Sequence, residues 1–146
     1  MSVVLSEGLM LAGIAWPLVV VGLLILPGLR SVGLALTPWA ALPVLLLSTF
    51  PNSTLKLPDV MLGGTLALDA TWRVFLLLIS ILWLASGVLA RARLLAVGSN
   101  VLSVMLLLAM TGSFGLVLAG DALMFFAAAT VAGYSLYGAL AYESDT

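Results

Sequence analysis

Residues 112–142, GSFGLVLAGDALMFFAAATVAGYSLYGALAY, decide the fold of this chain. Two apolar runs meet in them at Gly120 and Asp121, and the 21 residues after Asp121 carry no formal charge. A run of about 20 apolar residues crosses the hydrocarbon core of a bilayer as a helix. A carboxylate just before such a run accepts hydrogen bonds from the free N–H groups of the first helical turn. We therefore predict a tight turn between two membrane helices, with Asp121 as a helix cap in preference to an access point for ions.

The whole chain has the composition of a membrane protein. Of its 146 residues, 64% are hydrophobic and 8% are charged, and the mean hydropathy is +1.31. A soluble domain has about 45–50% apolar and about 25% charged residues. The chain has no cysteine and no histidine, which removes thiolate metal sites and the usual haem, zinc and proton-carrying ligands. With a net charge of −1 it offers no basic patch, so we expect no cofactor, no metal and no nucleic-acid partner.

The apolar runs predict an all-α membrane protein with about five transmembrane helices in one domain, residues 1–146. The expected spans are residues 9–29, 32–50, 72–90, 94–119 and 122–142. Pro17 should kink the first span, and Pro38 and Pro43 should bend or partly unwind the second, because proline removes a helical hydrogen bond. The first run is too long for the hydrophobic region of a signal peptide, so we interpret it as a membrane helix.

Residues 51–71, PNSTLKLPDVMLGGTLALDAT, break the apolar pattern between the second and third spans. Four leucines alternate with other residues around a turn at Gly63 and Gly64: Leu55, Leu57, Leu66 and Leu68. This alternation predicts a short interfacial β-hairpin. Asp69 follows it and should cap the third span, and we expect Asp69 and Arg73 to form a local i,i+4 pair.

Charges near the helix ends predict an orientation. With five spans, one side of the membrane holds the arginines at the first and third turns: Arg30, Arg91 and Arg93. The other side holds Lys56 and Arg73, partly offset by Asp59 and Asp69. Lys and Arg accumulate in cytoplasmic loops. We therefore expect an integral multi-pass protein of a bacterial inner membrane, with its N-terminus outside and its C-terminus in the cytoplasm.

No expected span carries an ionisable side chain near its middle. Such groups mark ion pathways in membranes, so we expect no catalytic residue and no proton relay from this chain alone. Thr130, Tyr134 and Tyr137 recur at i, i+4 and i+7 and share one helix face, which could hold a water chain or a quinone headgroup. We favour the alternative, in which Thr130 bonds to its own helix and the tyrosines pack or anchor near the headgroups.

The same helix carries small residues four positions apart. Ala128 is paired in this way with Ala132, and Ala129 with Gly133. Small residues at this spacing let two backbones approach closely, and such packing drives the association of helices in lipid. We expect these four residues to form a docking face for another helix.

Two stretches resemble a known family. Residues 66–90, LALDATWRVFLLLISILWLASGVLA, resemble the start of the third helix in the antiporter-like subunits of respiratory complex I, where a strand ending in Leu-Asp leads into an apolar helix. Residues 110–140, MTGSFGLVLAGDALMFFAAATVAGYSLYGAL, resemble the end of the fourth helix and the fifth helix of those subunits. The family includes the matching subunits of Mrp antiporters, membrane-bound hydrogenases and inorganic-carbon uptake complexes.

The resemblance covers roughly five helices and the hairpin, and it implies the N-terminal portion of such a subunit. When Asp121 and Tyr137 are laid on the family's pattern, the glutamate of the fifth-helix proton path falls on Thr130, a hydroxyl. The family's later helices, which bring the partner lysines, are also missing from this sequence. We therefore expect a structural, non-catalytic subunit of a complex I-like assembly that translocates protons or sodium ions. Its expected partners are a larger antiporter-like subunit, other subunits of the same complex and membrane lipids.

Two alternatives stay open. In the first, a partner subunit supplies the ionisable residues, and the face of Thr130, Tyr134 and Tyr137 lines a shared half-channel. In the second, the chain is a stand-alone small membrane protein and the likeness is accidental.

Overall fold

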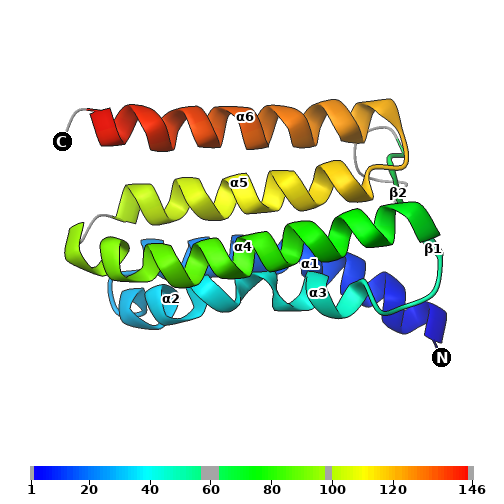
Figure 1. Ribbon diagram of the computed structural model, residues 1–146, viewed down its shortest axis with the longest axis horizontal. Helices are drawn as coiled ribbons and strands as arrows, with labels where there is room; N and C mark the ends of the chain where they lie inside the picture. The colour runs from blue at the N-terminus through cyan, green and yellow to red at the C-terminus, as the bar shows by residue number, and fades with distance from the viewer. Residues whose placement is uncertain (1, 57–62, 98–99, 145–146) are drawn as a thin grey trace.

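Five helical segments long and apolar enough to cross a membrane, together with one two-stranded sheet, make up the described part of the chain. The structure is a computed structural model that describes residues 2–56, 63–97 and 100–144 (Figure 1). The sheet lies between the second and third segments, at one end of the helical bundle. The expectation of a multi-pass, all-α membrane protein with a short β-hairpin is confirmed.

The first span is α1 (Ser2–Ile25), which contains Pro17 and ends earlier than the expected residue 29. Pro27 and Gly28 follow it in a turn, in which the Leu29 N–H donates to the carbonyl of Leu26 at 3.1 Å. Glycine and proline are common just beyond a helix C-terminus because neither continues the helix well. The predicted span was therefore too long at this end.

The second span is broken into three short pieces. They are α2 (Arg30–Leu36), the 3-10 helix η1 (Thr37–Ala41) and α3 (Leu42–Leu47). Pro38 and Pro43 stand in the first turns of η1 and α3, where a missing N–H removes no intrahelical bond. The predicted unwinding is therefore present.

Strands β1 (Ser53–Lys56) and β2 (Thr65–Leu68) pair antiparallel, with Ser53 opposite Leu68 and Lys56 opposite Thr65. In this register Gly63 and Gly64 both lie directly before β2, so they do not form the predicted two-residue turn between the strands. Gly63 has a positive φ of 87° and belongs to the connection between the strands, whereas Leu57 lies outside the described residues.

The last three helices are α4 (Ala70–Val97), α5 (Asn100–Leu118) and α6 (Ala122–Ser144). The third span was expected to end at residue 90, but α4 continues through Arg91 and Arg93. Arginine is a good helix former, and its apolar stem lets the charged group reach the membrane surface from within a helix. The two arginines therefore lie in the last turns of α4 without ending it, and α5 begins after the expected residue 94.

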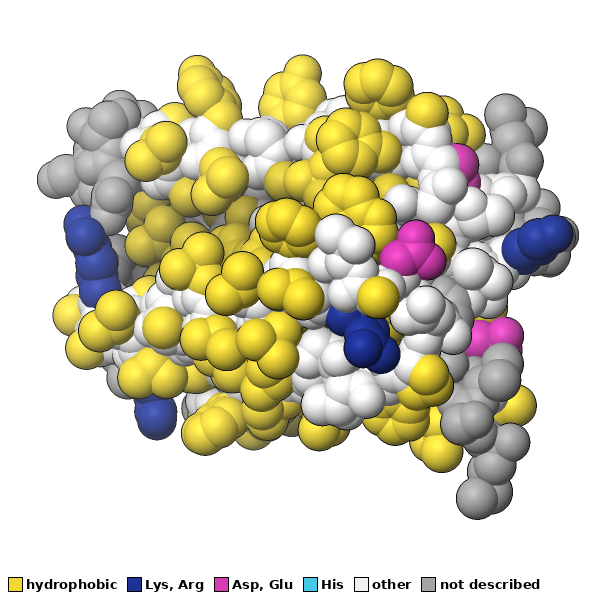
Figure 2. Space-filling model, turned by 45° about the vertical axis from the view of Figure 1, so that its right-hand side comes forward, with side chains coloured by type: hydrophobic (Ala, Val, Ile, Leu, Met, Phe, Trp, Pro, Cys, Tyr) yellow, Lys and Arg dark blue, Asp and Glu magenta, His cyan; other side chains and the backbone are white. Residues whose placement is uncertain are grey.

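Helix α5 lies between α1 and α6 and is the most enclosed span, whereas α4 packs mainly on η1 and also contacts α5 and α3. The main core contains the following fully buried side chains: Met10, Val20, Leu24, Leu47, Leu66, Leu76, Leu107 and Phe114. Many other large hydrophobic side chains are exposed, and they cover most of the face shown in Figure 2. An apolar exterior of this kind suits a protein surrounded by lipid.

The two termini lie at opposite ends of the bundle, as an odd number of spans requires (Figure 1). The N-terminus shares its end with the hairpin and with the start of α6. The opposite end holds the start of α2 and the end of α4, and therefore the three arginines Arg30, Arg91 and Arg93. We refer to these two ends as the hairpin end and the arginine end.

Candidate functional site

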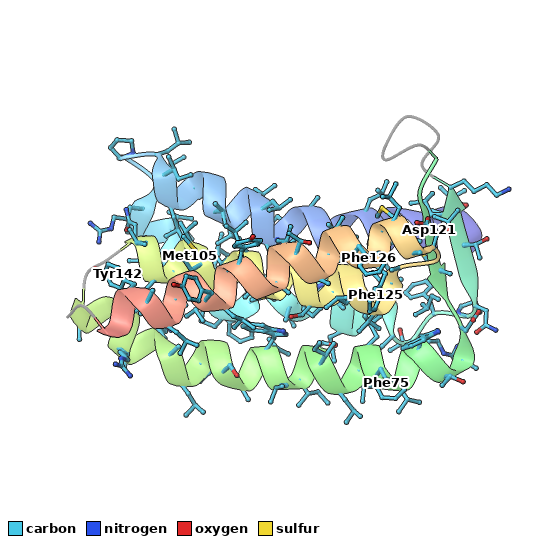
Figure 3. All side chains as sticks on the ribbon, turned by 90° about the horizontal axis from the view of Figure 1, so that it is seen from above. Phe75, Met105, Asp121, Phe125, Phe126 and Tyr142 are labelled. Atoms are coloured by element: carbon cyan, nitrogen blue, oxygen red, sulfur yellow. The ribbon has the colours of Figure 1, made fainter. Side chains whose placement is uncertain are left out.

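Asp121 joins α6 to the hairpin (Figure 3). Its Oδ1 accepts the Met124 N–H at 2.9 Å, which is the geometry of a helix N-cap. Its Oδ2 accepts the Thr65 N–H at 2.5 Å and the Thr65 hydroxyl at 3.2 Å. The Gly120 N–H in turn donates to the Thr65 carbonyl at 2.8 Å. Asp121 therefore caps its own helix and also fastens it to a strand 56 residues earlier in the chain, a link that the sequence did not predict.

These hydrogen bonds stabilise the ionised form of Asp121. Donation by the Met124 N–H, and next by the Thr65 N–H, holds the pKa of the carboxyl below its ordinary value of 3.8. A group that proton transport uses at neutral pH needs a pKa near 7. Asp121 therefore stays ionised at neutral pH, and it holds the start of α6 to the hairpin instead of carrying protons.

The expected pair of Asp69 and Arg73 is replaced by a different contact. The Arg73 side chain donates from Nη1 to the Phe50 carbonyl at 2.9 Å, beyond the end of the broken span. A basic side chain can satisfy carbonyls that a helix C-terminus leaves open. Asp69 directly precedes α4 and is exposed, and in the described part of the chain no hydrogen bond to its carboxylate is present. Its cap role therefore rests on its position at the positive end of the helix dipole.

The four small residues of α6 face in two directions. Ala128 and Ala132 face α5, where a Cβ added to Gly112 would lie 2.5 Å from the Ala132 N and 2.9 Å from the Ala128 carbonyl O. Ala132 is buried, whereas Gly133 is exposed and has open space around its Cα. Neighbouring helical positions are about 100° apart around the axis, at 3.6 residues per turn. One pair therefore forms the α5–α6 contact inside this chain, and the other faces outward.

The outward pair shares its face with the predicted hydroxyl residues. Together they line an open depression of about 370 Å³: Ala129, Thr130, Gly133, Tyr134 and Tyr137. We call these five residues the tyrosine face. Tyr134 and Tyr137 are 75% and 72% exposed, and the Thr130 hydroxyl donates to the carbonyl of Phe126 in its own helix at 2.8 Å. Thr130 therefore makes the local bond of the favoured interpretation, and the tyrosines project from the surface.

A second hollow was not predicted. It is a groove of about 590 Å³ between α4 and α6, with α5 as its floor, and Figure 2 shows the surface hollowed between these helices. Helix α4 contributes Ser86, Ala90 and Arg93, at i, i+4 and i+7. Their common face could be recognised from this spacing, but the sequence does not show that α6 stands opposite. Apolar residues complete the groove: Leu89, Leu94, Leu102, Leu106, Leu136, Ala139 and Leu140.

The described membrane spans contain no charged side chain near their middle. Their charged residues stand within four positions of a span end: Glu7, Arg30, Arg73, Arg91 and Arg93. The described residues also contain no group of acids that could hold a metal ion. This arrangement provides packing surfaces and anchors at the membrane surface, but no acid–base pair within the bilayer.

No family model, curated protein or solved structure matches this chain. The resemblance to antiporter-like subunits therefore stays a prediction from two stretches of sequence. A functional assignment has to depend on the fold, on the exposed faces of α6 and on the groove beside Arg93.

Proposed function

We propose that this chain is a non-catalytic, structural subunit of a larger membrane assembly and docks on a partner through the tyrosine face of α6. The observation that carries the proposal is the combination of an outward Ala129–Gly133 pair with two projecting tyrosines, in described spans without a charged side chain near their middle. The small residues admit the backbone of another helix, and the tyrosines supply rigid, amphipathic contacts beside it.

The assembly that we propose is complex I-like, with a larger antiporter-like subunit as the partner. This part of the proposal depends on the sequence resemblance. In such a setting the chain would extend the membrane arm or seal the lateral face of an ion-translocating subunit, because Thr130 offers no carboxylate.

Photo-crosslinking in native membranes tests the docking face. A photoreactive phenylalanine analogue at Tyr134 should yield an adduct with a second membrane polypeptide, whereas the same analogue at Phe75 should not. Phe75 is a matched control because it is also exposed, at 52%, but lies on α4. An adduct only with a second copy of this chain, or none at Tyr134, would contradict the proposed partner.

A substitution pair tests the same contact. Gly133→Leu fills the depression and should abolish co-purification of the partner in mild detergent. Gly22→Leu in α1 is the control, because a side chain at either glycine would meet no atom of this chain within 4 Å. Equal co-purification by both variants would show that the tyrosine face is not the docking surface.

A second candidate function is a half-channel that a partner completes, and the exposed hydroxyls of Tyr134 and Tyr137 favour it. Thr130→Val and Tyr137→Phe should then slow proton or sodium transport by the assembly without reducing its amount. Normal transport in both variants would exclude the half-channel and leave the structural role as the remaining candidate.

We also propose that the arginine end faces the cytoplasm of a bacterial inner membrane, because basic residues collect there. The chain has no cysteine, so single cysteines at the exposed residues Ser31 and Thr54 can report the two sides. A membrane-impermeant thiol reagent should label Thr54→Cys in intact cells and Ser31→Cys only after lysis. The reverse pattern would invert the orientation.

A further inference from the structure

The groove between α4 and α6, together with a smaller cavity beside it, reaches about half-way across a bilayer. Its lining begins at Arg93, near the end of the α4 span, and runs along α4 to Ser86. A smaller cavity of about 60 Å³ shares Ser86, Ala90, Leu94 and Leu106 with the groove, and its lining reaches Trp83. Ten helical residues separate Trp83 from Arg93, and at 1.5 Å per residue they span roughly 15 Å. The hydrocarbon core of a bilayer is about 30 Å thick, so the hollow has the depth of one leaflet.

The walls of the groove are apolar except for Arg93 at its mouth and Ser86 at its inner end. Leucines and alanines from three helices form the sides and floor, and Leu94, Leu102 and Ala139 make a buried cluster there. Arg93 stands at the membrane-surface end, and Arg91 lies at the same end of the bundle. Basic pockets between transmembrane helices attract anionic lipid headgroups. The charge of the mouth and the apolar walls below it therefore match the two parts of an anionic lipid.

We propose that this groove binds one acyl chain of an anionic phospholipid from the leaflet at the arginine end, with the lipid phosphate at Arg93. An acyl chain ends at mid-bilayer, as the hollow does at Trp83 and the buried Met110. A transmembrane helix of a partner would cross both leaflets, whereas the residues that line this groove lie in only one of them. The proposal does not depend on the docking of a partner at the tyrosine face.

Trp83 can report the acyl chain directly, because it lines the deep end of the hollow. The other three tryptophans, Trp16, Trp39 and Trp72, are exposed and can be replaced by phenylalanine. The full-length single-tryptophan protein would be reconstituted into mixed vesicles of phosphatidylglycerol and phosphatidylcholine. In one preparation the phosphatidylglycerol carries brominated acyl chains, and in the other the phosphatidylcholine does. Bromine quenches tryptophan fluorescence on contact.

Brominated phosphatidylglycerol should quench Trp83 about fivefold more effectively per lipid, the preference given by one basic residue near an anionic headgroup. Arg93→Gln should abolish this preference. Arg91→Gln, two positions away and therefore on another side of α4, removes the same charge and should retain it. Ser86→Phe, at an exposed lining position, should reduce quenching by both lipids because it narrows the groove.

Three results would overturn the proposal. Equal quenching by the two brominated lipids would mean that the mouth does not select charge. An equal loss of the preference for phosphatidylglycerol in Arg91→Gln and Arg93→Gln would mean that the general surface potential causes it, and not a lipid bound at Arg93. No quenching of Trp83 by either lipid would show that a protein segment, or nothing, occupies the hollow.

Discussion

The close contact of α5 with α6 at Gly112 gives a specific stability prediction. A Cβ added at Gly112 would lie 2.5 Å from the Ala132 N and 2.8 Å from the Ala132 Cα, whereas ordinary contact begins at 3.4 Å. The atoms in the way belong to the backbone, so no side-chain rotation relieves them. The distance from the Cβ to the Ala132 N is 0.9 Å short of ordinary contact, the difference between 3.4 and 2.5 Å, so α5 and α6 must move apart. Overpacking of this kind costs about 1–3 kcal/mol, and separation of the helices also loses dispersion contacts along their length.

Gly112→Ala should therefore lower the free energy of unfolding, because overpacking costs about 1–3 kcal/mol and alanine offsets about 1 kcal/mol of this through its higher helix propensity. The assay is equilibrium unfolding of the purified protein by increasing SDS in mild detergent micelles, followed by circular dichroism and tryptophan fluorescence. The transition of the variant should move to lower SDS.

Two other glycines of the same bundle provide the controls. Gly133→Ala places its methyl group in open space and should be neutral or slightly stabilising. Gly138→Ala meets the Met105 Sδ at 3.0 Å, and a flexible side chain can yield, so its effect should fall between the two. If Gly112→Ala unfolds at the same SDS concentration as Gly133→Ala, the reasoning from close backbone contact is refuted.

Three further predictions concern the hydrogen bonds of Asp121, Arg73 and Thr130. Because the pKa of Asp121 is lowered, its contribution to stability is complete above the ordinary value of 3.8 and is lost as pH falls through the lower folded value. Melting temperatures measured from neutral to acidic pH should therefore drop less below 3.8 in Asp121→Asn than in the wild type. Arg73→Met removes the bond to the Phe50 carbonyl and should cost about 1 kcal/mol in the SDS assay; no change would mean that water replaces it. Thr130→Val should change the free energy of unfolding by less than about 0.5 kcal/mol, since the exposed hydroxyl bonds only within its own helix, and a larger loss would reveal an unseen partner.

The sequence predicted the helical spans because length and hydropathy alone decide them in a membrane. It also placed the start of α6 correctly at Ala122, since an acid after a glycine is a strong local signal. It failed at the end of α4, where Arg91 and Arg93 were interpreted as a turn. In a bilayer, charged side chains indicate where a helix reaches the membrane surface, whereas the residue at which the helix ends depends on local backbone preferences. The overlooked Pro27 and Gly28 were the better signal for the end of α1.

The sequence identified only some of the features of the packing faces and the groove. The four-residue spacing identified the small residues of α6, but spacing cannot show which pair meets Gly112 and which faces outward. The bond from Thr65 to Asp121 and the groove beside Arg93 both join segments that are distant in the chain. Periodicity within one helix contains no information about such neighbours.

The hydrogen bonds from Thr65 to Asp121 fix the position of the first turn of α6 relative to the hairpin, and so fix the height of every later residue of the helix. At 1.5 Å per residue, Tyr134 and Tyr137 stand roughly 20 and 24 Å from Asp121, in the half of the bilayer nearer the arginine end. A partner must carry its complementary surface at that depth. One residue inserted between Asp121 and Thr130 would leave the hydrogen bonds to Thr65 intact. It would move the rings of Tyr134 and Tyr137 about 1.5 Å along α6 and rotate them by about 100° around the helix axis.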